Sequence, residues 1–187
     1  MKTPSIKKIY TEKAVPGLKK ELGIKNPMSI PRIAKVVVNV GIGKILKDQK
    51  RVDEVVSSLE AITGQKVLLT KARKAIAGFK IREDLEIGVR VTLHGERMWS
   101  FLDRLMNIAL PRVRDFQGIS KSSIDQNGNC NLGIKEHAIF SEIVPEKVQH
   151  NFSFQVNIVT TARDRKEGET LFRLLGMPFQ GEDHNAQ

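Results

Sequence analysis

Alternation of apolar and polar residues predicts the strands in the first half of the chain. Residues 32–40 place Ala34, Val36, Val38 and Val40 on one face, and Ile33, Lys35, Val37 and Asn39 on the other. Residues 85–94 alternate in the same way, and a shorter strand is expected at residues 67–70. Each long strand therefore has one core face and one more polar face.

A period near 3.6 residues predicts the helices. Asp48 is placed to cap a helix that ends before Gly64, and Asp164 to cap a last helix that ends at Gly176. A helix after Gly95 ends at Pro111, with Met98, Phe101, Leu102, Leu105, Ile108 and Ala109 as its buried stripe. Residues 5–22 form a basic amphipathic segment that Pro16 is expected to kink or divide.

The second half begins with a predicted hairpin. Asn127 and Gly128 lie between residues 122–124 and 130–134, and this pair favours a type I′ turn. Cys130 shares its strand parity with Leu132, which indicates a small buried side chain rather than a nucleophile. Phe152, Phe154, Val156 and Ile158 predict a further strand.

This order of elements predicts an α+β fold. We expect a largely antiparallel sheet with helices packed on one face, so that the other face stays open, and a long basic loop between two strands. The length suits one core, so residues 1–180 are expected to be a single domain, with residues 181–187 as an acidic, disordered tail.

Charge points to the class of partner. The chain has 31 Lys and Arg against 21 Asp and Glu; residues 1–121 hold 25 and 12 of these (net +13), and residues 122–187 hold 6 and 9 (net −3). A polarised basic chain is expected to carry a basic face, and nucleic acid is the leading partner. A basic surface without a specific partner is the alternative.

Residues 65–82 carry the densest positive charge, with six basic side chains and no Asp or Glu. Residues 71–84 lie between two predicted strands, and such long excursions are usually functional or disordered. A basic helix packed flat on the domain is the alternative, which Gly78 would interrupt. Either arrangement needs a partner that supplies negative charge.

Other chemistries fit the sequence less well. The run at residues 41–44 lacks Walker spacing, although a backbone turn near one phosphate stays open. Glu83, Asp84 and Glu86 offer a Mg²⁺ nuclease as an alternative, but a solvated turn is the simpler interpretation. No catalytic residue, metal site or cofactor is expected.

The single Cys and the lack of a long apolar run indicate a cytosolic protein without membrane association. Peripheral membrane binding by the basic N-terminal segment is a further alternative.

Seven runs in order, spanning nearly the whole chain, resemble the bacterial large-subunit ribosomal protein five family: PRIAKVVVNVGIG (31–43), GQK (64–66), TKARKAIAGFKIR (70–82), VTL (91–93), GERM (95–98), PRVRDF (111–116) and GMPF (176–179). The resemblance implies a structural role in the cytoplasmic ribosome, where the protein docks 5S rRNA in the central protuberance. It also implies contacts with 23S rRNA, peptidyl-site tRNA, small-subunit protein thirteen and other 5S-associated proteins.

Site residues carried over from the resemblance fall into three groups. The 5S rRNA set is Arg32, Lys35, Asn39, Gln65, Arg90 and Thr92. The tRNA-contacting loop is Lys71, Arg73, Lys74, Phe79, Lys80 and Arg82, and the intersubunit bridge is assigned to Arg112, Arg114 and Phe116. Phe116 has a second interpretation as the anchor of its loop. His94, Asn127, Cys130 and residues 149–152 depart from the family pattern.

Overall fold

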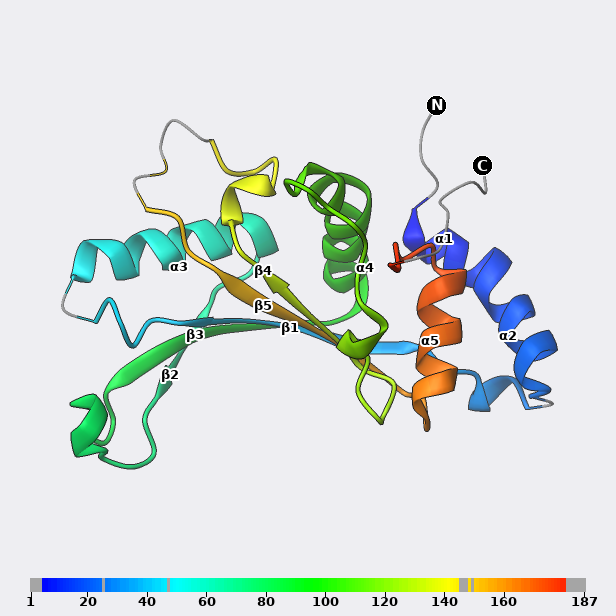
Figure 1. Cartoon of the computed structure of the whole chain (residues 1–187), viewed down its shortest axis with the longest axis horizontal. Helices are drawn as coiled ribbons and strands as arrows, with labels where there is room; N and C mark the ends of the chain where they lie inside the picture. Colours follow the sequence, from blue (N-terminus) through cyan, green and yellow to red (C-terminus); the bar gives the residue numbers. More distant parts are fainter. Residues whose placement is uncertain (1–4, 25, 47, 145–147, 149, 181–187) are drawn as a thin grey trace.

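A five-stranded antiparallel sheet organises the chain, as the computed structural model shows for residues 5–24, 26–46, 48–144, 148 and 150–180 (Figure 1). The strands run in the order β2-β3-β1-β5-β4, and every neighbouring pair is antiparallel. They are β1 (Ile33–Gly41), β2 (Leu68–Lys71), β3 (Glu86–Leu93), β4 (Cys130–Ile134) and β5 (Phe154–Thr160). The α+β prediction is confirmed. The expected tail at residues 181–187 lies outside the described residues.

Helices cover only one face of this sheet. Helices α3 (Gln49–Thr63) and α4 (Gly95–Arg104) lie above it in Figure 1, and the face below carries no helix among the described residues. A second group packs together at one end of the sheet: α1 (Ile6–Ile9), the π-helix η1 (Tyr10–Ala14), α2 (Val15–Leu22) and α5 (Arg165–Leu174). Short turns complete the chain: η2 (Pro27–Ser29), η3 (Ala77–Phe79), the π-helix η4 (Leu105–Ala109), η5 (Leu110–Arg112), η6 (Lys121–Ser123) and η7 (His137–Ile139).

The core forms between the sheet and α3 and α4. Val38 pairs with Val91 on β3 and with Val156 on β5, and all three side chains are buried. Leu59 of α3 and Phe101 of α4 are also fully buried in the same cluster. Apolar burial on this face fixes the register, because a slip of one residue would turn every core side chain outward.

Asp48 and Asp164 occupy the predicted N-cap positions of α3 and α5, but only Asp48 forms the capping hydrogen bond. Asp48 Oδ1 accepts a hydrogen bond from the Arg51 backbone N–H at 3.4 Å, and Gly64 ends α3 with φ of 65°. At α5, Asp164 makes no such side-chain bond. Glu167 Oε2 instead accepts from the backbone N–H of Arg163, the residue before the N-cap, at 2.9 Å. The break near Pro16 takes the form of η1, the π turn before α2.

Two irregularities change which side chains are buried. The β1–β5 register shifts between Ile33 and Lys35, so Ile33 is buried and Ala34 is exposed, opposite to the predicted alternation. After α4 the π-helix η4 widens the turn, which leaves Ile108 only half-buried while Met106 becomes buried. Both shifts follow from one extra residue in a regular repeat.

The predicted hairpin is shorter than its sequence indicates. Residues 121–123 form the 3₁₀ turn η6, and only Ile124 forms a bridge to Cys130. The Gly128 N–H donates to the Asp125 carbonyl, and Gly128 has φ of 73° whereas Asn127 does not have positive φ, so a type I′ turn is excluded. The Asp125 carboxylate fixes this turn by accepting from the backbone N–H groups of Asn127 and Asn129.

Cys130 is fully buried, as predicted. Its Sγ lies 3.9 Å from the Met177 Sδ, and burial raises the pKa of the thiol to about 12. A thiol with so high a pKa is a poor nucleophile at neutral pH.

None of the helices in the described part of the chain combines the length and the apolar composition that a membrane span requires.

Candidate nucleic-acid interface

The open face of the sheet presents amide and basic side chains from four strands. Asn39 of β1 pairs with Arg90 of β3 on one side and with Gln155 of β5 on the other. The next row across the sheet runs through Thr92, Val37, Asn157 and Asn131. Side chains directly opposite on antiparallel strands lie close together, so the polar members of these two rows form one surface, which Val37 interrupts.

Four of the six residues assigned to 5S rRNA lie on this open face: Lys35, Asn39, Arg90 and Thr92. Lys35, Asn39 and Arg90 are exposed, and Thr92 is half-buried. Strand alternation places them on the same face, because their sequence neighbours in the same strands, such as Val38 and Val91, point into the core.

Arg32 lies away from the others, just before β1. Its backbone N–H donates to Thr161 Oγ1 at 3.0 Å, and its carbonyl accepts from the Thr161 N–H at 2.9 Å. At about 3.3 Å per residue, Asn39 is about 23 Å further along the strand. Arg32 is exposed and lies outside the central cluster, next to Pro31, whose carbonyl accepts a hydrogen bond from the Tyr10 hydroxyl of η1.

Gln65 has a structural contact that sequence reasoning missed. Its Nε2 donates to the backbone carbonyl of Thr92 at 3.1 Å, beyond the last β2–β3 pair, Leu68 with Arg90. The side chain therefore continues the ladder where β2 has ended. This bond holds Gln65 beside Thr92 and orients its amide at the edge of the open face.

Three further polar residues on this face were absent from the predicted set: Asn131, Gln155 and Asn157. The Oδ1 of Asn157 is shielded from solvent and has no hydrogen-bond partner among the described residues. Alternation in residues 152–158 gives Gln155 and Asn157 the parity opposite to the buried Phe154 and Val156, but it does not show which strands they lie beside.

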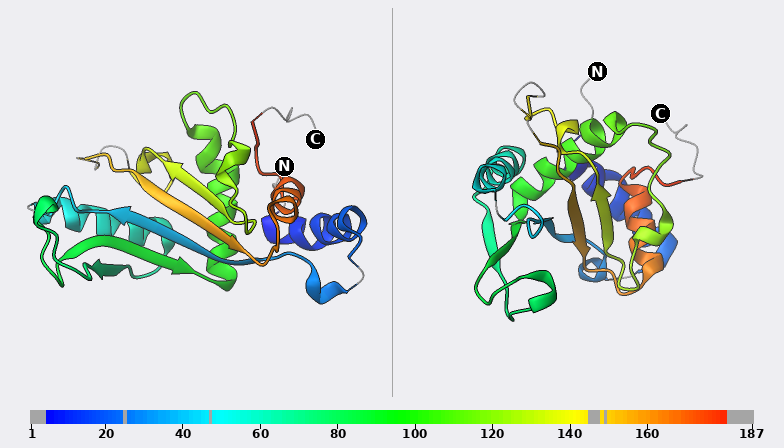
Figure 2. Two further views of the ribbon diagram at one scale, coloured as in Figure 1. Left: turned by 60° about the horizontal axis from the view of Figure 1, so that its bottom comes forward. Right: turned by 60° about the vertical axis from the view of Figure 1, so that its left-hand side comes forward.

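The basic loop at residues 71–84 projects from the β2–β3 hairpin, at the end of the sheet far from α2 and α5 (Figures 1 and 2). The alternative of a basic helix packed flat on the domain is wrong, because Ile76 and Ile81 form an antiparallel β-bridge. The tip of the loop consists of η3 and Lys80, which has φ of 54°. Ala72 is its one buried residue, since the N–H and carbonyl of Ala72 bond to Leu85 and Asp84.

All six residues assigned to the tRNA contact are exposed on this loop: Lys71, Arg73, Lys74, Phe79, Lys80 and Arg82. Phe79 exposes 75% of its surface, and Ile76 exposes 47%. Within the residues that the structure describes, none of the five basic side chains forms an ion pair. The loop therefore offers unpaired positive charge together with a bare aromatic ring.

The three carboxylates considered for Mg²⁺ are exposed beside this loop: Glu83, Asp84 and Glu86. Asp84 has φ of 61°, and its N–H donates to the Ala72 carbonyl, which places it in the turn that leads into β3. In the described part of the chain no group of three or more His, Cys, Asp or Glu residues is arranged to hold a metal ion.

Two of the three residues assigned to the intersubunit bridge, Arg114 and Phe116, line one side of a hollow of about 590 Å³. Arg114 and Phe116 contribute from residues 110–120, whereas Lys135 and Glu136 contribute from beyond β4. Arg112 is exposed but does not line the hollow. Phe116 is half-buried against the core, as expected of a loop anchor.

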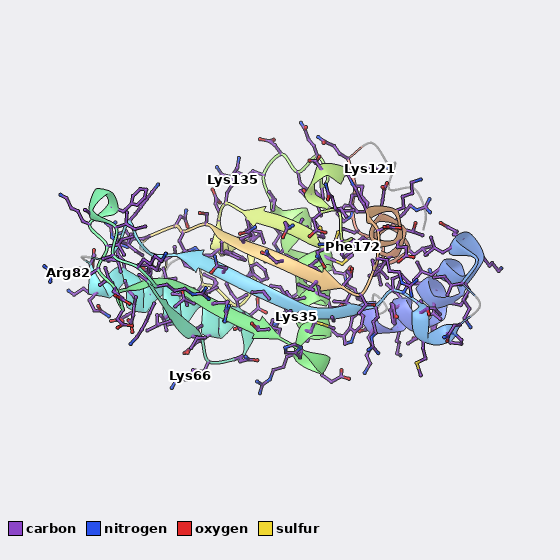
Figure 3. The ribbon with its side chains drawn as sticks, turned by 90° about the horizontal axis from the view of Figure 1, so that it is seen from below. Lys35, Lys66, Arg82, Lys121, Lys135 and Phe172 are labelled. Atoms are coloured by element: carbon purple, nitrogen blue, oxygen red, sulfur yellow. The ribbon has the colours of Figure 1, made fainter. Side chains whose placement is uncertain are left out.

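Basic side chains surround the open face, as Figure 3 shows from below. Lys35 lies over the strands, Lys66 and Lys135 lie toward opposite edges, and Arg82 lies at the loop. Lys121 at the far side is ion-paired with Glu169 at 2.8 Å. This arrangement suits a polyanion that lies across the sheet and reaches the loop.

Comparisons with known proteins agree over almost the entire chain. The family model described as ribosomal protein L5 matches residues 26–82, and a second model, which describes the C-terminus of the same ribosomal family, matches residues 86–179. Large ribosomal subunit protein uL5 of Solidesulfovibrio magneticus is 51% identical, covering 94% of this chain and 98% of the relative. The proteins of the same name from Rubrobacter xylanophilus and Mesoplasma florum are 50% and 51% identical, over 94% and 91% of this chain and 97% and 94% of the relatives.

Proposed function

The chain belongs to the ribosomal protein L5 family and is a structural constituent of the large ribosomal subunit, and we propose that it binds 5S rRNA through the open face of its sheet. As a member of this family it is not an enzyme, and it works in the cytoplasmic ribosome. The observation that carries the proposal is the continuous polar surface built around Asn39, Arg90 and Thr92, which no described helix covers.

The chemistry of this surface fits folded RNA. RNA helices hide their base edges in a narrow major groove, so proteins recognise backbone shape, 2′-hydroxyl groups and unpaired bases. Asn39 and Thr92 hold short donors and acceptors on a rigid strand, and Arg90 adds charge between them. The sheet residues therefore supply recognition, and the surrounding lysines supply attraction.

A second contact is proposed for the loop at residues 71–84, with peptidyl-site tRNA. Its five basic residues lack ion-pair partners in the described part of the chain, and Phe79 is bare. Because the loop leaves the sheet at one end, it can meet a different RNA from the one on the open face (Figure 2). Contacts with 23S rRNA and other 5S-associated proteins belong to the same proposal.

The intersubunit bridge to small-subunit protein thirteen is proposed for the hollow beside Arg114 and Phe116, with Arg112 exposed nearby. Two segments meet there, and the buried part of Phe116 holds the first of them in place. One hydrophobic cluster runs from Ile6 to Phe179, which supports treating residues 1–180 as a single RNA-binding domain.

Replacing Asn39 and Thr92 together by alanine tests the 5S proposal. The double variant is expected to bind 5S rRNA about tenfold or more weakly in a gel shift, because two base- or ribose-facing hydrogen-bonding groups are lost. The control is Thr11→Ala with Asn107→Ala, which removes the same side-chain types from exposed helical positions. Equal affinity of the double variant and the wild type, with unchanged circular dichroism, rejects the sheet as the recognition surface.

A further inference from the structure

A hollow of about 480 Å³ lies on the open face, where β1 and β5 meet β4. Its open-face lining forms two rows across the strands. One row is Asn39, Gln155 and Gly133, which the register places side by side, and the other is Gly41, Ser153 and Lys135. The hollow falls within the size range of small-ligand sites, about 300–1,000 Å³.

Two glycines create this hollow. An added Cβ on Gly41 or on Gly133 would meet no atom within 4 Å, and neither glycine has the positive φ that excludes other residues. Neither packing nor backbone conformation therefore requires glycine here. The missing side chains leave the strand backbone accessible, which suits a ligand that approaches it closely.

The other lining groups are those that a nucleotide needs. Asn39 and Gln155 are directly opposite, so both amides can present donors and acceptors to one base edge. Lys135 is exposed and forms no ion pair with a described residue. None of the described lining residues is acidic, so a phosphate meets no repulsion from them.

We propose that this hollow binds one unpaired nucleotide of 5S rRNA. Asn39 and Gln155 bond its base edge, Lys135 pairs with its phosphate, and its ribose lies over Gly133. Proteins that recognise RNA sequence do so mainly at unpaired nucleotides, whose edges are free. The inference rests on the proposed 5S binding, and it adds to the predicted set a subsite formed by β5, β4 and the residue after β4.

Gly133→Val fills the hollow without removing any hydrogen-bonding group. Valine is favoured in strands and meets open space at this position, so the melting temperature is expected to stay near the wild-type value. Affinity for 5S rRNA in a gel shift is expected to fall about tenfold, as for loss of one bidentate base contact. Gly78→Val is the matched control, because Gly78 also has open space around it but lies in the projecting loop.

Chemical probing of 5S rRNA in complex with the wild type and with Gly133→Val identifies the nucleotide that the hollow binds. One unpaired base that the wild type protects is expected to become reactive with Gly133→Val, while the remaining protections persist. If the wild type itself fails to bind 5S rRNA, the proposed function is rejected. If the wild type binds and Gly133→Val binds equally well, only the subsite is rejected.

Two other outcomes also decide the matter. Unchanged 5S affinity of Gly133→Val with reduced incorporation into ribosomes assigns the hollow to a protein partner and overturns the proposal.

If Gly133→Val lowers the melting temperature, Lys135→Ala replaces it as the test. That variant is expected to reduce the slope of log K against log salt by about 1, because one phosphate contact is lost, and an unchanged slope contradicts the subsite.

Discussion

At the scale of single residues, strand register places the polar groups of the open face and few side-chain contacts hold them. Asn39 and Arg90 face each other only because Val38 and Val91 are buried on the opposite side. Gln65 is the exception, since its bond to the Thr92 carbonyl fixes it from the edge. Substitutions on the open face are therefore expected to change binding with little effect on stability.

His137 is a buried titratable residue whose effect on stability can be tested. Its ring stacks on Phe152 with centroids 4.0 Å apart, and burial lowers the pKa of the imidazole, against smaller opposing contributions from the Glu54 carboxylate and the Phe152 backbone. The unfolded chain therefore binds the proton more readily, so stability is present above the ordinary histidine pKa of about 6.5 and is lost as the pH falls below it.

His137→Phe keeps an aromatic ring but removes the titrating group. The free energy of unfolding of this variant, measured by urea denaturation at pH 7 and pH 5, is expected to fall less on acidification than that of the wild type, by about 1 kcal/mol or less. An identical pH dependence in both proteins contradicts this assignment of the buried imidazole.

At the scale of elements, the regular repeats could be predicted from sequence and their interruptions could not. The alternation in β3 and the capped helix α3 appear where expected, since each depends on local residue order. The bulge at Ala34 and the π turn η4 insert one residue into a repeat, and tertiary packing decides where that residue goes. The turn at Gly128 differs from the prediction because Asp125 satisfies its backbone donors.

The projecting loop is best tested by changing its charge and keeping its length. Deleting residues 72–80 would remove Ala72, whose backbone bonds to Leu85 and Asp84 close the base of the loop. Replacing Arg73, Lys74, Lys80 and Arg82 by glutamine keeps those bonds. We expect unchanged 5S rRNA affinity and about tenfold faster loss of peptidyl-site tRNA from assembled ribosomes in filter binding. Loss of 5S affinity would show that the two surfaces are not separable.

The turn at Gly128, just before β4, packs closely against α5, and this contact allows a second test at the scale of elements. A Cβ added to Gly168 would lie 2.5 Å from the Gly128 backbone, which cannot move aside as a flexible side chain can. Gly168→Ala is therefore expected to destabilise the fold by about 3 kcal/mol in thermal or urea unfolding. Gly78→Ala, with open space around it, should change stability by less than about 1 kcal/mol. Similar stabilities of the two variants would contradict this close packing.

At the scale of the whole molecule, the helices leave one face of the sheet uncovered (Figures 1 and 3). Much of this site could be predicted, because strand parity and the family resemblance together place Asn39, Arg90 and Thr92 on one surface. Asn131, Gln155 and Asn157 were missed because β4 and β5 join the surface only through pairing with distant β1. Such pairing between distant segments cannot be read from local alternation.

Site-specific photo-crosslinking tests the central claim most directly. A crosslinking residue is placed at Gln155 on the open face or, as the control, at the exposed Ala61 on α3, and each protein is irradiated in complex with 5S rRNA. RNA bound across the open face predicts efficient crosslinks from position 155 and only background from position 61. Equal or stronger crosslinking from position 61 would contradict the account.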